Sequence, residues 1–222
     1  EAPVSAQLAG LVCGPFPSFI PKTDQERVQN IVHEVFVEHK NSKFEVTLKM
    51  DGSSCTVYYN DGHIGVCSRN YELMNDEKNK NNPFIRVSND SGIIDALKKL
   101  KRNVALQCEL MGPGIQGNRE NFNNLKLFCF DVYDISEGRY FLPEERELFC
   151  ERLIDYGIGS QFSHIKIVRD VCMNEFKNVD ELLLFADGPS LNNNVREGLV
   201  FKHRQQNFSF KVISNKFLLG EG

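Results

Sequence analysis

The 222-residue sequence has no tryptophan, and none of its apolar runs approaches the roughly 20 residues that a membrane-spanning helix needs, so we expect no membrane span. No signal peptide is visible at the N-terminus, and an initiator methionine is also lacking, so we expect a fragment or a processed product. An excess of positive charge is lacking too, because 26 Lys and Arg against 30 Asp and Glu give a formal net charge of −4. Overall charge therefore gives no sign of nucleic-acid binding, although a local cationic groove remains possible in such a chain.

The cysteines lack both features of a disulfide or zinc framework. Their number is odd, and no two of them form a Cys-x-x-Cys pair. Most of them lie inside apolar runs, which predicts reduced core thiols in an intracellular protein, without distinguishing cytoplasm, nucleus and organelle. The seven residues are Cys13, Cys55, Cys67, Cys108, Cys129, Cys150 and Cys172.

The spacing of apolar residues predicts one domain in which strands outnumber helices. Thr23 and Glu26 form a capping-box pattern before apolar residues at helical spacing, which predicts a helix over 23–36. Alternating residues from Phe44 then predict a strand that ends at Lys49, and the polar stretch 71–82 predicts an exposed loop. Further strands are expected at 55–59 and 63–68 (a hairpin), 104–110, 125–135, 198–203 and 208–214, and helices from 91, over 143–157 and over 179–186.

This order of elements predicts an α+β fold with antiparallel β-sheets and flanking helices, because most strands follow one another through hairpins or loops. A repeated strand–helix–strand array is not expected. With 41% hydrophobic residues, the chain can form a sizeable core.

A lysine at a strand end begins the first chemically informative segment, Lys49-Met50-Asp51-Gly52. Such a lysine can act as a covalent nucleophile only if nearby cations or burial lower its pKa from the usual value of about 10.4. A solvated lysine beside an Asp-Gly turn explains the same four residues, so the segment alone does not decide between the two interpretations.

Other charged and aromatic residues recur on later predicted strands, in a fixed order. Five strand segments that each offer such a group can converge on one pocket in an antiparallel domain. The segments are Cys67-Ser68-Arg69-Asn70, Cys108-Glu109-Leu110-Met111-Gly112, Phe128-Cys129-Phe130-Asp131, Glu197-Gly198-Leu199-Val200-Phe201-Lys202 and Phe210-Lys211-Val212.

In this order the segments resemble the covalent nucleotidyltransferase superfamily of polynucleotide ligases and mRNA capping enzymes. The details are most similar to ATP-dependent RNA ligases of the phage RNA ligase 2-like group. Within it, Phe19-Ile20-Pro21-Lys22-Thr23-Asp24 and the loop from Gly112 to Asn118 favour the Deinococcus/Naegleria-type branch. The resemblance implies an ATP-grasp-like nucleotidyltransferase (adenylyltransferase) domain over 1–222, as part of a longer protein with an additional OB-like domain.

The resemblance also implies the chemistry. Lys49 would attack the α-phosphate of ATP and hold AMP, and the AMP would pass to a 5′-phosphate end before joining to a 3′-OH end. Asp51, Glu109 and Glu197 would organise Mg²⁺ or Mn²⁺, partly through water, as a hard cation allows. The other roles that it implies are a nucleotide contact at Leu48, a ribose contact at Glu109, adenine stacking on Phe130, a phosphate or RNA-end contact at Arg69, and a phosphate groove lined by Lys202 and Lys211.

Several alternatives remain at this point. Phe128 competes with Phe130 as the stacking ring, and both Arg69 and Lys202 can also be explained as surface residues. A DNA ligase and an mRNA guanylyltransferase use the same lysine, and an inert RNA-binding module would keep the same fold. The expected partners are RNA ends in a nicked duplex, bound by a monomer with no membrane association.

Overall fold

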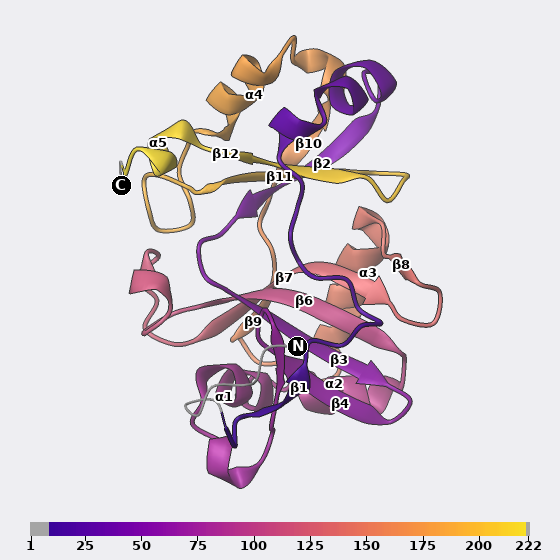
Figure 1. The fold of residues 1–222 in the computed structure, drawn as a ribbon, viewed down its shortest axis with the longest axis vertical. Helices are drawn as coiled ribbons and strands as arrows, with labels where there is room; N and C mark the ends of the chain where they lie inside the picture. The colour runs from indigo at the N-terminus through magenta and orange to yellow at the C-terminus, as the bar shows by residue number, and fades with distance from the viewer. Residues whose placement is uncertain (1–8, 221–222) are drawn as a thin grey trace.

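The computed structural model describes residues 9–220 and contains two β-sheets, which lie one above the other in Figure 1. Every strand pairing in them is antiparallel except the pairing of β7 with β9. The predicted α+β class is therefore confirmed. Within the described residues, no helix is both long enough and apolar enough to cross a membrane.

The larger sheet has the order β1-β5-β4-β3-β6-β7-β8, and β9 pairs with β7 outside this path. The predicted hairpin is present, and Asp61 and Gly62 at its tip both have positive φ, as a tight two-residue turn requires. The strands are β1 (Val12–Pro15), β3 (Ser53–Asn60), β4 (His63–Cys67), β5 (Tyr71–Leu73), β6 (Val104–Met111), β7 (Lys126–Asp134), β8 (Arg139–Tyr140) and β9 (Phe162–His164).

Helices α1 (Pro83–Asp90), α2 (Ile93–Leu100) and α3 (Pro143–Ile154) contribute to a single hydrophobic core with the larger sheet. The apolar stripe predicted for α2 is buried there, because Ile93, Ile94 and Leu97 all face the sheet core. All seven cysteines lie in the described part of the chain and are free, as expected. Cys13 and Cys172, however, are not core residues.

The smaller sheet has the order β10-β2-β11-β12 and carries the predicted lysine strand in its interior. Its outer face packs against α4 and the chain that precedes β2, whereas its other face looks toward the larger sheet. Polar Glu45 and Thr47 on that inner face are fully buried, so β2 is covered on both sides. The elements are β2 (Lys43–Lys49), β10 (Ile167–Cys172), β11 (Gly198–His203), β12 (Ser209–Ile213), α4 (Val179–Ala186) and α5 (Asn215–Leu218).

Two predicted local structures are wrong in extent. The helix expected over 23–36 is replaced by an extended segment, a short 3₁₀ helix (Val28–Asn30) and a π-helix (Glu34–Glu38). The backbone of Glu26 accepts a hydrogen bond from the N–H of Lys211 on β12, so this part of the chain pairs with a strand and cannot coil. The loop expected over 71–82 contains β5, which pairs with both β1 and β4.

Candidate active site

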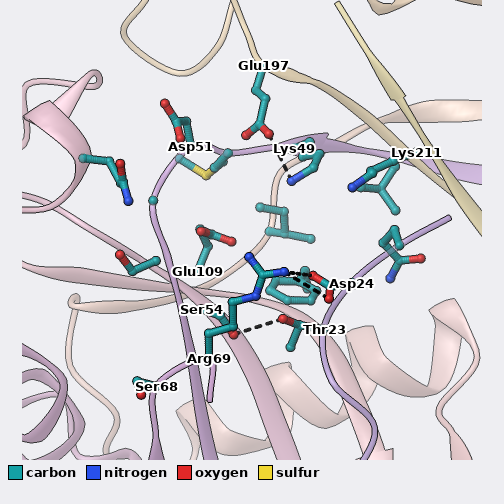
Figure 2. Close-up of a pocket in the computed structure, with 18 of the residues that line it drawn as sticks. Thr23, Asp24, Lys49, Asp51, Ser54, Ser68, Arg69, Glu109, Glu197 and Lys211 are labelled. Atoms are coloured by element: carbon teal, nitrogen blue, oxygen red, sulfur yellow. Dashed lines mark hydrogen bonds and ion pairs between the residues drawn. The ribbon is translucent and has the colours of Figure 1, made fainter. Parts of the chain in front are cut away.

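A cavity of about 500 Å³ lies between the two sheets, and Figure 2 shows the side chains around it. It receives residues from β2, β11 and β12 of the smaller sheet and from β3, β6 and β7 of the larger one. Eight of the nine residues singled out in the sequence line it, which places groups from distant parts of the chain in one site. They are Leu48, Lys49, Asp51, Arg69, Glu109, Phe130, Glu197 and Lys211.

Lys49 is the last residue of β2 and lies opposite Gly198 of β11. Its Nζ forms an ion pair with Oε1 of Glu197 at 3.2 Å, and the two side chains are only 24% and 16% exposed. Figure 2 shows this amine pointing into the cavity, next to the amine of Lys211. An ammonium group has no free electron pair, so Lys49 must lose a proton, and with it this ion pair, before it can attack an electrophile.

Three carboxylates share the cavity with Lys49. Burial raises the pKa of Glu109 to about 7; the charges of Glu197 and Asp51 add to this rise, and Lys49 opposes it. Burial likewise raises the pKa of Glu197, and the ion pair with Lys49 works against that rise. The site therefore holds more buried negative charge on this side than Lys49 alone can neutralise.

The donor set of Asp51, Glu109 and Glu197 fits a divalent cation that keeps part of its water shell. A cation among these oxygens would offset the burial and repulsion that raise the pKa values of Glu109 and Glu197. Carboxylate oxygens are also the donors that Mg²⁺ and Mn²⁺ prefer. In the described part of the chain, no three His, Cys, Asp or Glu side chains are grouped closely enough to hold a metal ion directly.

Gly52 allows the loop after β2 to approach β6. A Cβ atom built on Gly52 would lie 2.3 Å from the main-chain oxygen of Leu110 and 2.4 Å from Sδ of Met111. Contacts this short are far inside van der Waals distance, so any larger residue would push the loop away from β6. The glycine thus keeps Asp51 close to the strand that carries Glu109.

Lys211 contributes a second cation on the β12 side of the cavity. Its main chain forms a bridge with Arg27, and its N–H donates to the carbonyl of Glu26 at 2.8 Å. Burial lowers the pKa of Lys211, and the charges of Lys49 and Arg27 add to the effect. An anionic group placed between Lys49 and Lys211 would relieve this repulsion.

Arg69 reaches the rim of the cavity from the turn between β4 and β5. Its guanidinium donates to both carboxylate oxygens of Asp24, at 3.1 and 3.2 Å. Both side chains are more than 60% exposed, and an ion pair in that setting contributes little free energy. Arg69 can therefore exchange Asp24 for a phosphate at low energetic cost.

Four apolar side chains line part of the cavity, and this part is called the apolar slot. Leu48, Ile165 and Val200 line it and are nearly inaccessible to solvent, and the Phe130 ring lies there as well. The pairing of β6 with β7 shifts by one residue between Gln107 and Cys108, so Phe130 has no partner across the ladder. The alternative ring, Phe128, does not line the cavity; it is 6% exposed and stacks on Phe122.

Lys202 is the one predicted residue that does not line the cavity. Its side chain is 7% exposed and pairs with Asp131 Oδ1 at 2.9 Å, and its ammonium also donates to the main-chain oxygen of Phe130. The alternative of a solvated edge is therefore wrong, and Lys202 lies outside the cavity that the other predicted residues line. The side chain is buried because its ammonium binds Asp131 and the main chain of Phe130, both on β7.

Sequence reasoning missed the contribution of residues 23–25, which form one wall of the cavity. Thr23 does not cap a helix; its Oγ1 lies 3.0 Å from Oγ of Ser54 on β3. Gln25 connects the two sheets, because its amide accepts from Ser209 Oγ at 2.6 Å and donates to Asp131 Oδ2 at 3.5 Å. The signal that could have found these residues is the unbroken polar run Lys22-Thr23-Asp24-Gln25, which a helix cap alone does not require.

Comparison with known proteins relates the chain to RNA ligases. The family model described as RNA ligase matches residues 42–213. A Naegleria gruberi RNA ligase mutant without ligand is 45% identical, with a TM-score of 0.88 over 99% of this chain. A mutant of the same enzyme with ATP and Mn is also 45% identical, with a TM-score of 0.89 over 100% of this chain. No curated protein sequence gave a match.

The chain spans 63% of the length of these two Naegleria chains. A third structure of that enzyme, with pyrophosphate, is 45% identical and has a TM-score of 0.88, with the same 63% coverage of the longer chain. Two of these structures contain ligands, namely ATP with Mn in one and pyrophosphate in the other. The lysine, the carboxylates and the apolar slot of this chain are groups that could bind such ligands.

Proposed function

Because the chain belongs to the RNA ligase family, we propose that it carries out the adenylyltransferase chemistry of ATP-dependent RNA ligation, with Lys49 as the nucleophile. The neutral amine of Lys49 attacks the α-phosphorus of ATP, a P–N bond forms, and the bond to pyrophosphate breaks. AMP then passes to the 5′-phosphate of an RNA end, and the attack of a 3′-OH releases AMP and joins the ends.

The observation that carries this proposal is that Lys49 shares one cavity with the apolar slot and with two groups of charges. The slot formed by Leu48, Phe130 and Val200 can hold a purine, and a base stacked there would direct its phosphates toward Lys49. Lys211 and Arg69 lie where they can neutralise phosphate oxygens as charge develops. Positioning and charge neutralisation are the main contributions to phosphoryl transfer.

The carboxylates support the same assignment. When bound, Mg²⁺ or Mn²⁺ supplies charge neutralisation for the phosphates. Asp51, Glu109 and Glu197 would hold it through its waters, as argued above from their buried charge. A cation near Glu197 would also weaken the hold of that carboxylate on Lys49, which favours the neutral amine.

For the partner, we propose RNA ends held in a nicked duplex, with the 5′-phosphate approaching the rim at Arg69. The net charge of −4 opposes general binding to phosphates, so a duplex needs local cations or further chain to hold it. We also propose that the chain acts as a monomer in the cell interior, as the reduced thiols expected from the sequence would permit.

The proposal is tested by separating adenylylation from sealing. The chain is incubated with labelled ATP or GTP and Mg²⁺ or Mn²⁺, and then with a 5′-phosphorylated nick that has RNA or DNA on the 3′-OH side. We expect acid-labile label from ATP, and weak, salt-sensitive sealing by these 222 residues alone. Label from GTP only would identify a guanylyltransferase, and absence of label from both would indicate an inert binding module.

Replacing Phe130 by alanine is expected to weaken ATP binding by about tenfold, because one base–aromatic stack contributes roughly 1–3 kcal/mol. Replacing Phe128 by alanine serves as the matched control, since this ring packs on Phe122 outside the cavity. Equilibrium binding measures the ATP affinity of both variants, and urea denaturation measures their stability. A larger loss of ATP affinity for the Phe128 variant would reassign the stacking ring.

A further inference from the structure

A buried ion pair links helix α3 to the strand that carries Lys49. Arg146 of α3 has no solvent exposure, and its Nη2 donates to Oε1 of Glu45, which is equally buried on β2. The Nε group of Arg146 donates to Nε2 of His164 at 3.1 Å. None of these residues lines the cavity, and the proposed chemistry uses none of them.

Glu45 lies next to the ammonium that holds Phe130. In the pairing of β2 with β11, Glu45 is directly opposite Lys202, and cross-strand neighbours have Cβ atoms about 4.5–5.5 Å apart. Lys202 nevertheless binds Asp131 and the main-chain oxygen of Phe130. Two buried carboxylates, those of Glu45 and Asp131, thus compete for one ammonium group.

The guanidinium of Arg146 pairs with one of these two carboxylates, that of Glu45. With Glu45 neutralised by the guanidinium, Lys202 remains bound to Asp131 and to the main chain of Phe130. We propose that Arg146 is a positioning residue for nucleotide binding, acting through Glu45 and Lys202 on the Phe130 ring. The inference rests on the proposed function, because it assigns to Phe130 the role of stacking on the base.

Removal of Arg146 alone would leave Glu45 as an unpaired charge in a buried site. Buried charges interact strongly because little water screens them, so Lys202 would move toward Glu45 and release Phe130. The ring would then lose its fixed place at the shifted pairing of β6 with β7. Since Arg146 contacts no reacting group, the change falls on ATP affinity, and the adenylylation rate at saturating ATP is retained.

Removal of both partners has the opposite result. In the double variant Glu45→Leu/Arg146→Met, apolar side chains replace the ion pair, a change that buried pairs often tolerate. The competing carboxylate is then absent, so Lys202 stays with Asp131 and Phe130. A merely structural role for Arg146 predicts instead that the single variant loses stability while its folded molecules bind ATP with unchanged affinity.

The experiment measures ATP dissociation constants and single-turnover adenylylation for the full chain and its variants. Arg146→Met is expected to weaken ATP binding by about tenfold, as for loss of a base stack, with an unchanged rate at saturation. The double variant is expected to bind ATP like the unaltered chain. Arg139→Met is the matched control, because Arg139 of β8 forms an exposed ion pair with Glu145 of α3, the helix that carries Arg146.

If Arg146→Met does not fold, Arg146→Gln takes its place, since it keeps a hydrogen-bond donor for Glu45 without the charge, and the same tenfold loss is expected. Unchanged ATP affinity in the folded single variant overturns the inference, and so does a double variant as weak as the single one. A fall in the saturated rate with unchanged affinity also overturns it. If the unaltered chain neither binds ATP nor becomes adenylylated, the proposed function itself fails, which is a separate outcome.

Discussion

Replacing Lys49 by methionine or alanine is expected to abolish formation of the protein–AMP bond while the fold is retained. The amine of Lys49, at the end of β2, is the one that would form the P–N bond. Methionine keeps the apolar stem of the side chain, and Lys49 is partly exposed, so little packing is lost. Mass spectrometry after incubation with ATP and Mn²⁺ detects the adduct directly.

Lys43→Met is the matched control for this result. Lys43 begins the same strand that Lys49 ends, but its side chain is exposed and does not line the cavity. The control is therefore expected to accept AMP like the unaltered chain, and denaturation curves should show both variants folded. AMP found on the Lys49→Met variant would place the nucleophile elsewhere, with Lys211 as the first residue to examine.

The faces of the smaller sheet were predictable from the sequence because its strands follow a period of two. Alternate residues along each strand share a face of the sheet. The observed pairing places Val200 opposite Lys211 and opposite Thr47, which is two residues before Lys49, so Lys49, Val200 and Lys211 lie on the same face. The same period places Lys202 on this face, as expected. The sequence could not predict where along this face the cavity ends. It ends where β7 covers Lys202, and that contact depends on how the two sheets, whose strands are far apart in the sequence, pack together.

The segment before β2 was mispredicted because its local signals and its tertiary contacts disagree. Thr23, Glu26 and the following apolar residues satisfy a helix cap and a helical period. In the folded chain, Thr23 instead contacts Ser54, and the Glu26 carbonyl receives the N–H of Lys211. A strand edge that needs a hydrogen-bond partner outweighed a weak local preference for helix.

Removing the carboxylate charge of Glu197 or Asp51 is expected to slow adenylylation far more than it weakens ATP binding. Each group would act on the metal shell, and so mainly on the charge that develops as pyrophosphate leaves. Glu197→Ala and Asp51→Ala are expected to lower the single-turnover rate by about 100-fold or more, the size of effect seen when one such stabilising group is removed. ATP affinity should change by less than about threefold, because ground-state contacts to the base and ribose remain.

The isosteric variants Glu197→Gln and Asp51→Asn decide whether the lost charge or the lost volume is responsible. They keep the shape of each side chain, so rates as low as those of the alanine variants assign the effect to charge. Glu144→Gln is the control, because Glu144 is an exposed carboxylate on α3 that does not line the cavity.

Glu197 also holds Lys49, so its loss frees the amine, whereas loss of Asp51 does not. A rate that falls for Asp51→Asn but is retained by Glu197→Gln would therefore show that Glu197 restrains the nucleophile rather than organising the metal. Equal losses of rate and ATP affinity in both would make these carboxylates ground-state contacts to the nucleotide.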